Sequence, residues 1–144
     1  MAILLDNDGN PIYNTGFDMK ALIDNLPAGL DRAMLRVLSF HIGHGNVISR
    51  GRLVAELANC GFQVHEREAR ACINLLRKDG IAICSTGGGE GGYWLAADQD
   101  ELEEFIQKEM DSRAMDLLEQ ARAMRAAAEK RWGRYSPEKQ ASLF

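Results

Sequence analysis

The apolar and polar positions between Val64 and Leu95 predict a helix followed by a two-stranded hairpin. From about His65 to Asp79, apolar residues recur at steps of three and four, the period of a helix with one buried face. These apolar positions are Ala69, Cys72, Ile73 and Leu76. Gly80 follows, where a left-handed residue would end the helix. The segments IAICS, GGGEGG and YWLA then predict a strand, a glycine-rich turn and a returning strand.

Two more helices are predicted before this segment. Asp31 and Ser49 each stand where a capping side chain begins a helix, and Gly61 stands where the second of these helices ends. Their inward-facing positions are Ala33, Met34, Val37 and Leu38 in the first helix, and Leu53, Val54, Leu57 and Ala58 in the second. A short turn containing glycine then joins the second helix to the helix at 65–79, as in a helix-turn-helix.

A long C-terminal helix is predicted over residues 98–132, because Asp98 caps its start and neither Gly nor Pro interrupts it. Its apolar stripe consists of Leu102, Ile106, Met110, Ala114, Leu117, Ala121, Met124 and Ala128. From Met110 onward the spacing is that of a heptad seam. We therefore expect a coiled-coil homodimer through residues 106–128, with a single exposed helix as the alternative.

The two ends of the chain complete the predicted organisation. Residues 1–17 contain turn formers between short apolar runs and predict a hairpin, followed by a short helix over Asp18–Asn25. Residues 133–144 read as a flexible polar tail. The fold class is mainly α with a small β-hairpin wing and a long C-terminal helix. The expected divisions are 1–30, 31–97, 98–132 and 133–144.

Composition bounds the class of protein. The chain has 144 residues, of which 46% are hydrophobic, and no apolar run reaches the ~18 residues that cross a bilayer. The opening MAILLDNDG has no basic lead, so a secretory signal is not expected. Three cysteines, an odd number, favour reduced thiols and a cytoplasmic location.

The distribution of charge points to a local nucleic-acid contact. The net charge is −4, but residues 31–80 hold eight Lys or Arg against five Asp or Glu. Residues 98–130 hold five Lys or Arg against ten Asp or Glu. A basic segment within an acidic protein is the footprint of a nucleic-acid contact. A solvated face of mixed charge would look similar.

Residues 31–97 resemble the winged helix-turn-helix DNA-binding domains of bacterial regulators of the DeoR and biotin-repressor types. They also resemble small phage and prophage DNA-binding proteins. The matching segments are ISRGRLVAELA, REARACINLLRKDGI and GGYWLA. The resemblance implies that the helix at 64–79 enters the major groove and that the wing touches phosphates or the minor groove.

Carried over by position, the groove-facing residues are Arg67, Arg70 and Asn74, with Glu66 and Ala71 beside them. Arg grips guanine and Asn grips adenine, each through two hydrogen bonds. The full DNA-binding set implied by the resemblance is Arg50, Arg52, Arg67, Arg70, Asn74, Arg77, Lys78, Gly88 and Gly89. Glu66 and Glu68 depart from this pattern by adding negative charge at the helix end that should meet phosphates. They leave two readings open, selection for cytosine amino groups or weak DNA binding.

The last five residues, QASLF, resemble the pentapeptide by which bacterial replication and repair proteins dock on the sliding clamp. Gln140, Leu143 and Phe144 match its fixed positions. Leu and Phe would fill an apolar pocket on the clamp, and Gln would set the register. A chance match to so short a pattern is the alternative.

Other kinds of site are not expected. The three cysteines form no C-x-x-C pair, so they read as small buried hydrophobes and not as zinc ligands. No GK[ST] follows the glycine run, and no nucleophile–base arrangement is present. We therefore expect a non-enzymatic DNA-binding protein without a cofactor, acting in replication or transcriptional control. The alternative is a protein–protein adaptor that uses a winged helix, the long helix and the clamp-binding-like tail.

Overall fold

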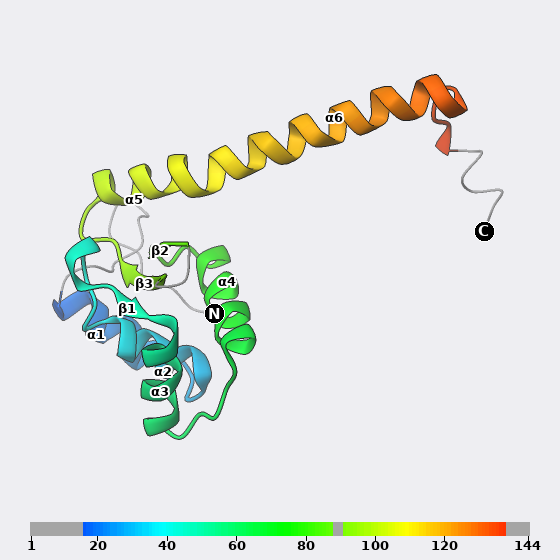
Figure 1. The fold of residues 1–144 in the computed structure, drawn as a ribbon. Coiled ribbons are helices and arrows are strands. Elements are labelled where there is room, and N and C mark those ends of the chain that lie inside the picture. Colours follow the sequence, from blue (N-terminus) through cyan, green and yellow to red (C-terminus); the bar gives the residue numbers. More distant parts are fainter. Residues whose placement is uncertain (1–15, 88–90, 138–144) are drawn as a thin grey trace. The chain divides into compact units, whose positions relative to one another are not determined.

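The periodic segments of the first part of the chain form helices packed around a small sheet. The computed structural model describes residues 16–87 and 91–137, and the chain divides into two units, Met1–Phe105 and Ile106–Phe144. In the first unit the order is α1 (Gly16–Asn25), α2 (Leu30–Leu38), a 3-10 turn (His44–Asn46), β1 (Ile48–Ser49), α3 (Arg50–Asn59), α4 (Glu66–Lys78), β2 (Ile83–Ser85), β3 (Gly92–Leu95) and α5 (Gln99–Phe105) (Figure 1). The predicted fold class is confirmed. Most of the hairpin predicted over residues 1–17 lies outside the described residues.

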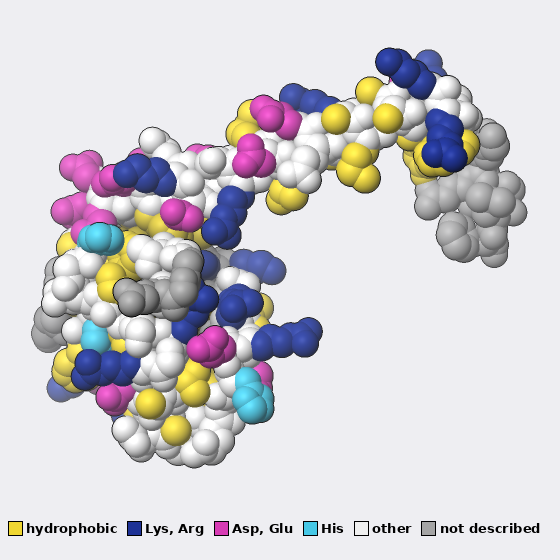
Figure 2. Space-filling model, in the orientation of Figure 1, with side chains coloured by type: hydrophobic (Ala, Val, Ile, Leu, Met, Phe, Trp, Pro, Cys, Tyr) yellow, Lys and Arg dark blue, Asp and Glu magenta, His cyan; other side chains and the backbone are white. Residues whose placement is uncertain are grey.

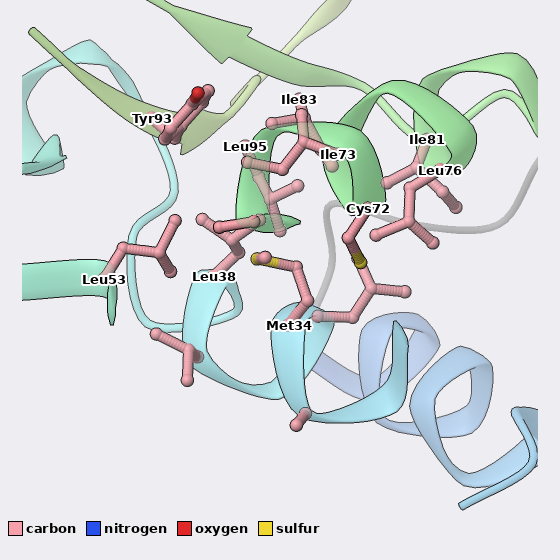
Figure 3. Packing of buried hydrophobic residues seen from close by; sticks show 14 of the residues in the cluster. Met34, Leu38, Leu53, Cys72, Ile73, Leu76, Ile81, Ile83, Tyr93 and Leu95 are labelled. Carbon is pink, nitrogen blue, oxygen red and sulfur yellow. The ribbon is translucent and has the colours of Figure 1, made fainter. Parts of the chain in front are cut away.

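One apolar core joins the helices of this unit to the sheet. The stripe of α4 predicted from the sequence is buried, and Ile73 and Leu76 belong to the same core cluster as Met34 and Leu38 of α2 (Figure 3). The same core contains Leu22, Ile23 and Leu26, from α1 and the residue that follows it. Each fully buried Leu or Ile contributes about 1.5–3 kcal/mol through removal from water. The short N-terminal helix is therefore part of the core.

The wing contains a third strand that the pattern of the sequence does not show. The strand order is β1-β3-β2, and both pairings are antiparallel. Ile48 of β1 lies opposite Tyr93, and Cys84 of β2 lies opposite Trp94. The central strand β3 is buried along its whole length.

The two faces of β3 are covered by different parts of the unit. Tyr93 and Leu95 belong to the helical core, whereas Trp94 alternates to the other face. There the indole Nε1 of Trp94 donates a 2.6 Å hydrogen bond to Oε1 of Glu101 in α5. The rings of His44 and Phe105 meet the indole edge-on, with centroids 4.9 and 6.4 Å away. These contacts hold α5 against the wing.

The second unit continues the helical chain. Residues Ile106–Asp111 form a π-helical segment, and α6 extends from Ser112 to Trp132. The sequence predicts one regular helix over 98–132, and the structure departs from it at this widened turn. A π-helical segment inserts extra chain into a turn without needing Gly or Pro, so composition does not reveal it. No helix among the described residues has the length and hydropathy to span a membrane.

Gly92 sets the closeness of β1 and β3. A Cβ at this position would collide with the carbonyl oxygen of Ile48 and would lie 2.8 Å from Cγ1 of Val47. We expect Gly92→Ala to lower the free energy of unfolding by about 1–3 kcal/mol, because the backbone of the wing must shift. Gly51→Ala is the matched control, since its Cβ would meet nothing within 4 Å in α3. The control should gain about 0.5–1 kcal/mol in urea unfolding, and equal effects of the two changes would contradict the close approach.

Two cysteines are buried next to the core. Sγ of Cys72 lies 3.2 Å from Oδ1 of Asp31 and donates its proton to it. Burial, followed by the hydrogen bond and the negative charge of Asp31, raises the pKa of Cys72 to about 12. Burial also raises the pKa of Cys84 to about 12, whereas Cys60 is exposed. The folded state thus keeps two protonated thiols well above the pH at which free thiols ionise.

We expect this difference to make the fold sensitive to alkali. Unfolded thiols ionise near the ordinary pKa of 9.0, so the stabilisation is complete below that pH and is lost above it. At about pH 10 each buried thiol should lower the free energy of unfolding by roughly 1 kcal/mol relative to neutral pH. Urea unfolding across this range should show a shallower loss in Cys72→Ala and Cys84→Ala than in wild type. Cys60→Ala should keep the wild-type slope, and an unchanged slope in all three variants would refute the assignment.

Candidate nucleic-acid interface

The side of α4 that faces away from the core carries cationic and amide side chains. Arg67, Arg70, Asn74 and Lys78 are exposed and follow one another at steps of three, four and four. This spacing places them on one face, opposite the buried stripe that contains Ile73. Figure 2 shows Lys and Arg side chains gathered over α4. The outer face of α4 is thus a continuous row of hydrogen-bond donors.

Among the described residues, these side chains have no internal partner. Within residues 16–87 and 91–137, no ion pair involves Arg67, Arg70 or Lys78. The four outward residues of α4 also make no side-chain hydrogen bond to the described part of the chain. Their charges are therefore available to an external anion.

The two acidic residues at the start of α4 differ in what they contact. Oε1 of Glu68 accepts a 3.2 Å hydrogen bond from the backbone N–H of His65, the residue that caps α4. This is one half of a capping box, and it places negative charge at the positive end of the helix dipole. Glu66 is exposed in the same turn. Glu68 therefore has a local structural role, and Glu66 is the acid left beside the cationic row.

A tight turn fixes α4 relative to α3. Gly61 adopts φ +94°, in the left-handed region, and the backbone N–H of Phe62 returns to the carbonyl oxygen of Leu57. At the other end of α3, Ser49 accepts a 3.2 Å hydrogen bond from the backbone N–H of Arg52 and caps the helix. This places the exposed side chain of Arg52 in the first turn of α3, at the positive end of the helix dipole.

Arg50 packs against the base of the wing. Its backbone N–H lies 3.4 Å from the carbonyl oxygen of Gly91, and its side chain is half-buried. A Cβ at Gly91 would collide with the guanidinium of Arg50 and with the carbonyl oxygen of Thr86. Gly91 therefore lets the guanidinium of Arg50 lie directly on the wing backbone.

Arg77 has an internal role although it belongs to the last turn of α4. Its Nε donates to the carbonyl oxygen of Ile83 at 2.8 Å, and Nη2 donates to Oγ of Ser85 at 3.0 Å. The guanidinium also lies over the ring of Phe105, with Cζ 5.2 Å from the centroid, and burial lowers the pKa of Arg77. Arg77 thus bonds to the edge strand β2, which leaves Lys78 as the exposed cation of this turn.

The other predicted site residues lie outside the described residues. These residues are Gly88 and Gly89, and Gln140, Leu143 and Phe144 near the C-terminus. Their roles in contacts with DNA and with a sliding clamp stay predictions. Among the described residues, β2 ends at Ser85 and β3 begins at Gly92.

Comparisons of this chain with models of known families, with curated proteins and with solved structures found no match. The resemblance to winged-helix domains therefore depends on the motif residues and on the fold described above. A helix-turn-helix followed by an antiparallel wing is the arrangement that such domains use to present a helix to DNA. The function built on this arrangement is a proposal.

Arg77 and Lys78 are neighbouring cations of α4, and we expect them to contribute differently to stability. We expect Arg77→Ala to lower the free energy of unfolding by about 2–3 kcal/mol, because two charged hydrogen bonds to β2 are lost in a half-buried place. Lys78→Ala removes the same charge from the adjacent exposed position. This change should alter the free energy of unfolding by no more than about 0.5 kcal/mol. Urea unfolding of both variants measures the difference. Equal stabilities would show that the contacts of Arg77 do not hold the wing.

Proposed function

We propose that this chain is a non-enzymatic protein that binds double-stranded DNA through α4. The observation that supports it is the row of exposed cations on α4, opposite the core, that no described residue neutralises. A helix 13 residues long extends about 20 Å and fits the major groove, which is about 12 Å wide. Replication and transcriptional control in phage or prophage, within the cytoplasm, are the roles we propose on the resemblance alone.

The residues of this face divide by the contacts they suit. Arg67, Arg70 and Asn74 are the candidates for base edges, because Arg pairs with guanine and Asn with adenine through two hydrogen bonds. Lys78 and Arg52 are the candidates for phosphates, which accept from point charges and from helix N-termini. Glu66 would accept from the amino group of cytosine or repel a phosphate. Arg77 is left out of this set because its guanidinium bonds to β2.

An adaptor that binds another protein is the second candidate. The observation that favours it is Leu75, a large apolar side chain on α4 that is 58% exposed. An apolar side chain beside Arg residues also suits a protein interface, where both kinds are enriched. Loss of binding to DNA after charge removal, without an effect of Leu75→Ala, would favour DNA over this alternative.

Fluorescence anisotropy with a labelled random-sequence duplex tests the proposal. Binding should weaken with salt, with a log–log slope of about −0.9 for each phosphate contacted. We expect Lys78→Ala to reduce the magnitude of this slope by about 0.9. Arg67→Ala and Arg70→Ala should each weaken the sites selected from a random duplex library by about 1–3 kcal/mol.

Arg36→Ala is the matched control, because it removes one exposed positive charge from α2 and leaves α4 intact. It should leave both the affinity and the salt slope close to those of the wild type. Weak affinity for all duplexes, unchanged by the substitutions in α4, would overturn the proposal. Equal losses in Arg36→Ala and Lys78→Ala would show that net charge is responsible and not a surface on α4.

A further inference from the structure

α6 exposes a row of large apolar side chains that a lone helix would leave in water. Leu117 is 64% exposed, Met124 is 72% exposed and Leu118 is 48% exposed. Along the seam, Met110, Leu117 and Met124 occupy one heptad position, while the other position carries alanine each time, at Ala114, Ala121 and Ala128. One heptad position of the seam therefore carries large side chains and the other carries only alanine along its whole length.

The charges of the second unit are separated along the same helix. From Ile106 to Glu119 acidic residues predominate, and from Gln120 to Arg134 basic residues predominate. The acidic residues of the first part are Glu109, Asp111, Asp116 and Glu119, against Lys108 and Arg113. The basic residues of the second part are Arg122, Arg125, Lys130, Arg131 and Arg134, against Glu129. The π-helical segment and the first part of α6 are thus net acidic, and the last part of α6 with the residues up to Arg134 is net basic.

We propose that α6 pairs with α6 of a second copy of this chain in an antiparallel coiled coil. In the register that we infer, Leu117 faces the partner's Ala121, Met124 faces the partner's Ala114, and Met110 faces the partner's Ala128. Antiparallel helices pair the two heptad positions with each other, so each layer receives one large and one small side chain. Parallel helices would pair alanine with alanine in one layer and a large side chain, Leu117 or a methionine, with its own copy in the next. Underfilled layers would then alternate with crowded ones.

The residues beside the seam fit the same register. Leu118 would meet the partner's Leu118 at the two-fold axis, and Asp111 would meet the partner's Arg125. Both side chains of the charged pair are exposed in the single chain. Antiparallel pairing also brings the acidic half of one helix to the basic half of the other, whereas parallel pairing would place like charges together.

Sedimentation equilibrium of the full chain without DNA tests the pairing. We expect a mass of twice the chain mass for the wild type, and a dimer Kd raised about 100-fold or more in Leu118→Asp, where two carboxylates meet at the axis. Met115→Asp is the matched control, because Met115 is 51% exposed, against 48% for Leu118, and lies off the seam. Its Kd should stay within about three-fold of the wild type. Circular dichroism checks that both variants keep their helix content.

The orientation is tested by exchanging charges. Asp111→Arg and Arg125→Asp should each raise the dimer Kd about ten-fold, and the double exchange should return it to within about three-fold of the wild type. These residues are about 21 Å apart along one helix, so they couple only across an antiparallel partner. Charge exchange at Asp116 and Arg122, off the seam, is the control and should leave the Kd within the same limit.

Each outcome decides one part of the proposal. A wild-type chain that stays monomeric at about 100 µM would overturn the pairing, as would equal effects of Leu118→Asp and Met115→Asp. A dimer in which the effects of Asp111→Arg and Arg125→Asp simply add would overturn the antiparallel orientation. All of these measurements are made without DNA, so failure of DNA binding and failure of pairing are distinguishable.

Discussion

The first unit depends on the burial of β3 from both sides. Tyr93 and Leu95 close the helical core, while Trp94 packs on the opposite face against α5 and bonds to Glu101. A strand can be enclosed in this way only if its neighbours come very close, and Gly92 permits that approach to β1. The wing is therefore built into the core of the unit, and its base is a rigid support. A rigid base is what a surface needs in order to hold side chains in one geometry for a partner.

The cations of α4 divide between stability and exposure for a geometric reason. Arg77 lies at the edge of the buried stripe, close enough to β2 for its guanidinium to bond to the strand and stack on Phe105. Lys78 is the next residue but is turned by about 100° around the helix, so it points to solvent. Adjacent residues of the same charge therefore have different roles: Arg77 contacts β2, and Lys78 is exposed to solvent. Charge alone is therefore a poor guide to which residues are available to a partner.

The second unit differs from the first in that its described residues form no buried core. Among its described residues none is fully buried, so the interactions within α6 are the local ones of a helix. Alanine-rich sequence and pairs such as Arg113 with Glu109 support a helix of this length locally. Forming the helix does not by itself bury the large apolar side chains along its seam. Their burial requires a second surface, which we propose is an antiparallel second copy of the same helix.

The sequence by itself determined the helices and the outward face of α4. The 3.6-residue period, the cap at Ser49 and the stop at Gly80 are local features, so they predict α3, α4 and the exposure of Arg67, Arg70 and Lys78. Only the tertiary structure decided the internal role of Arg77, the partner of Trp94, the π-helical segment and the strand at Ile48. β1 has two residues, too few to show a period, and it is formed by pairing with a strand more than 40 residues later. Contacts between such distant residues depend on the packed core, and no local pattern encodes them.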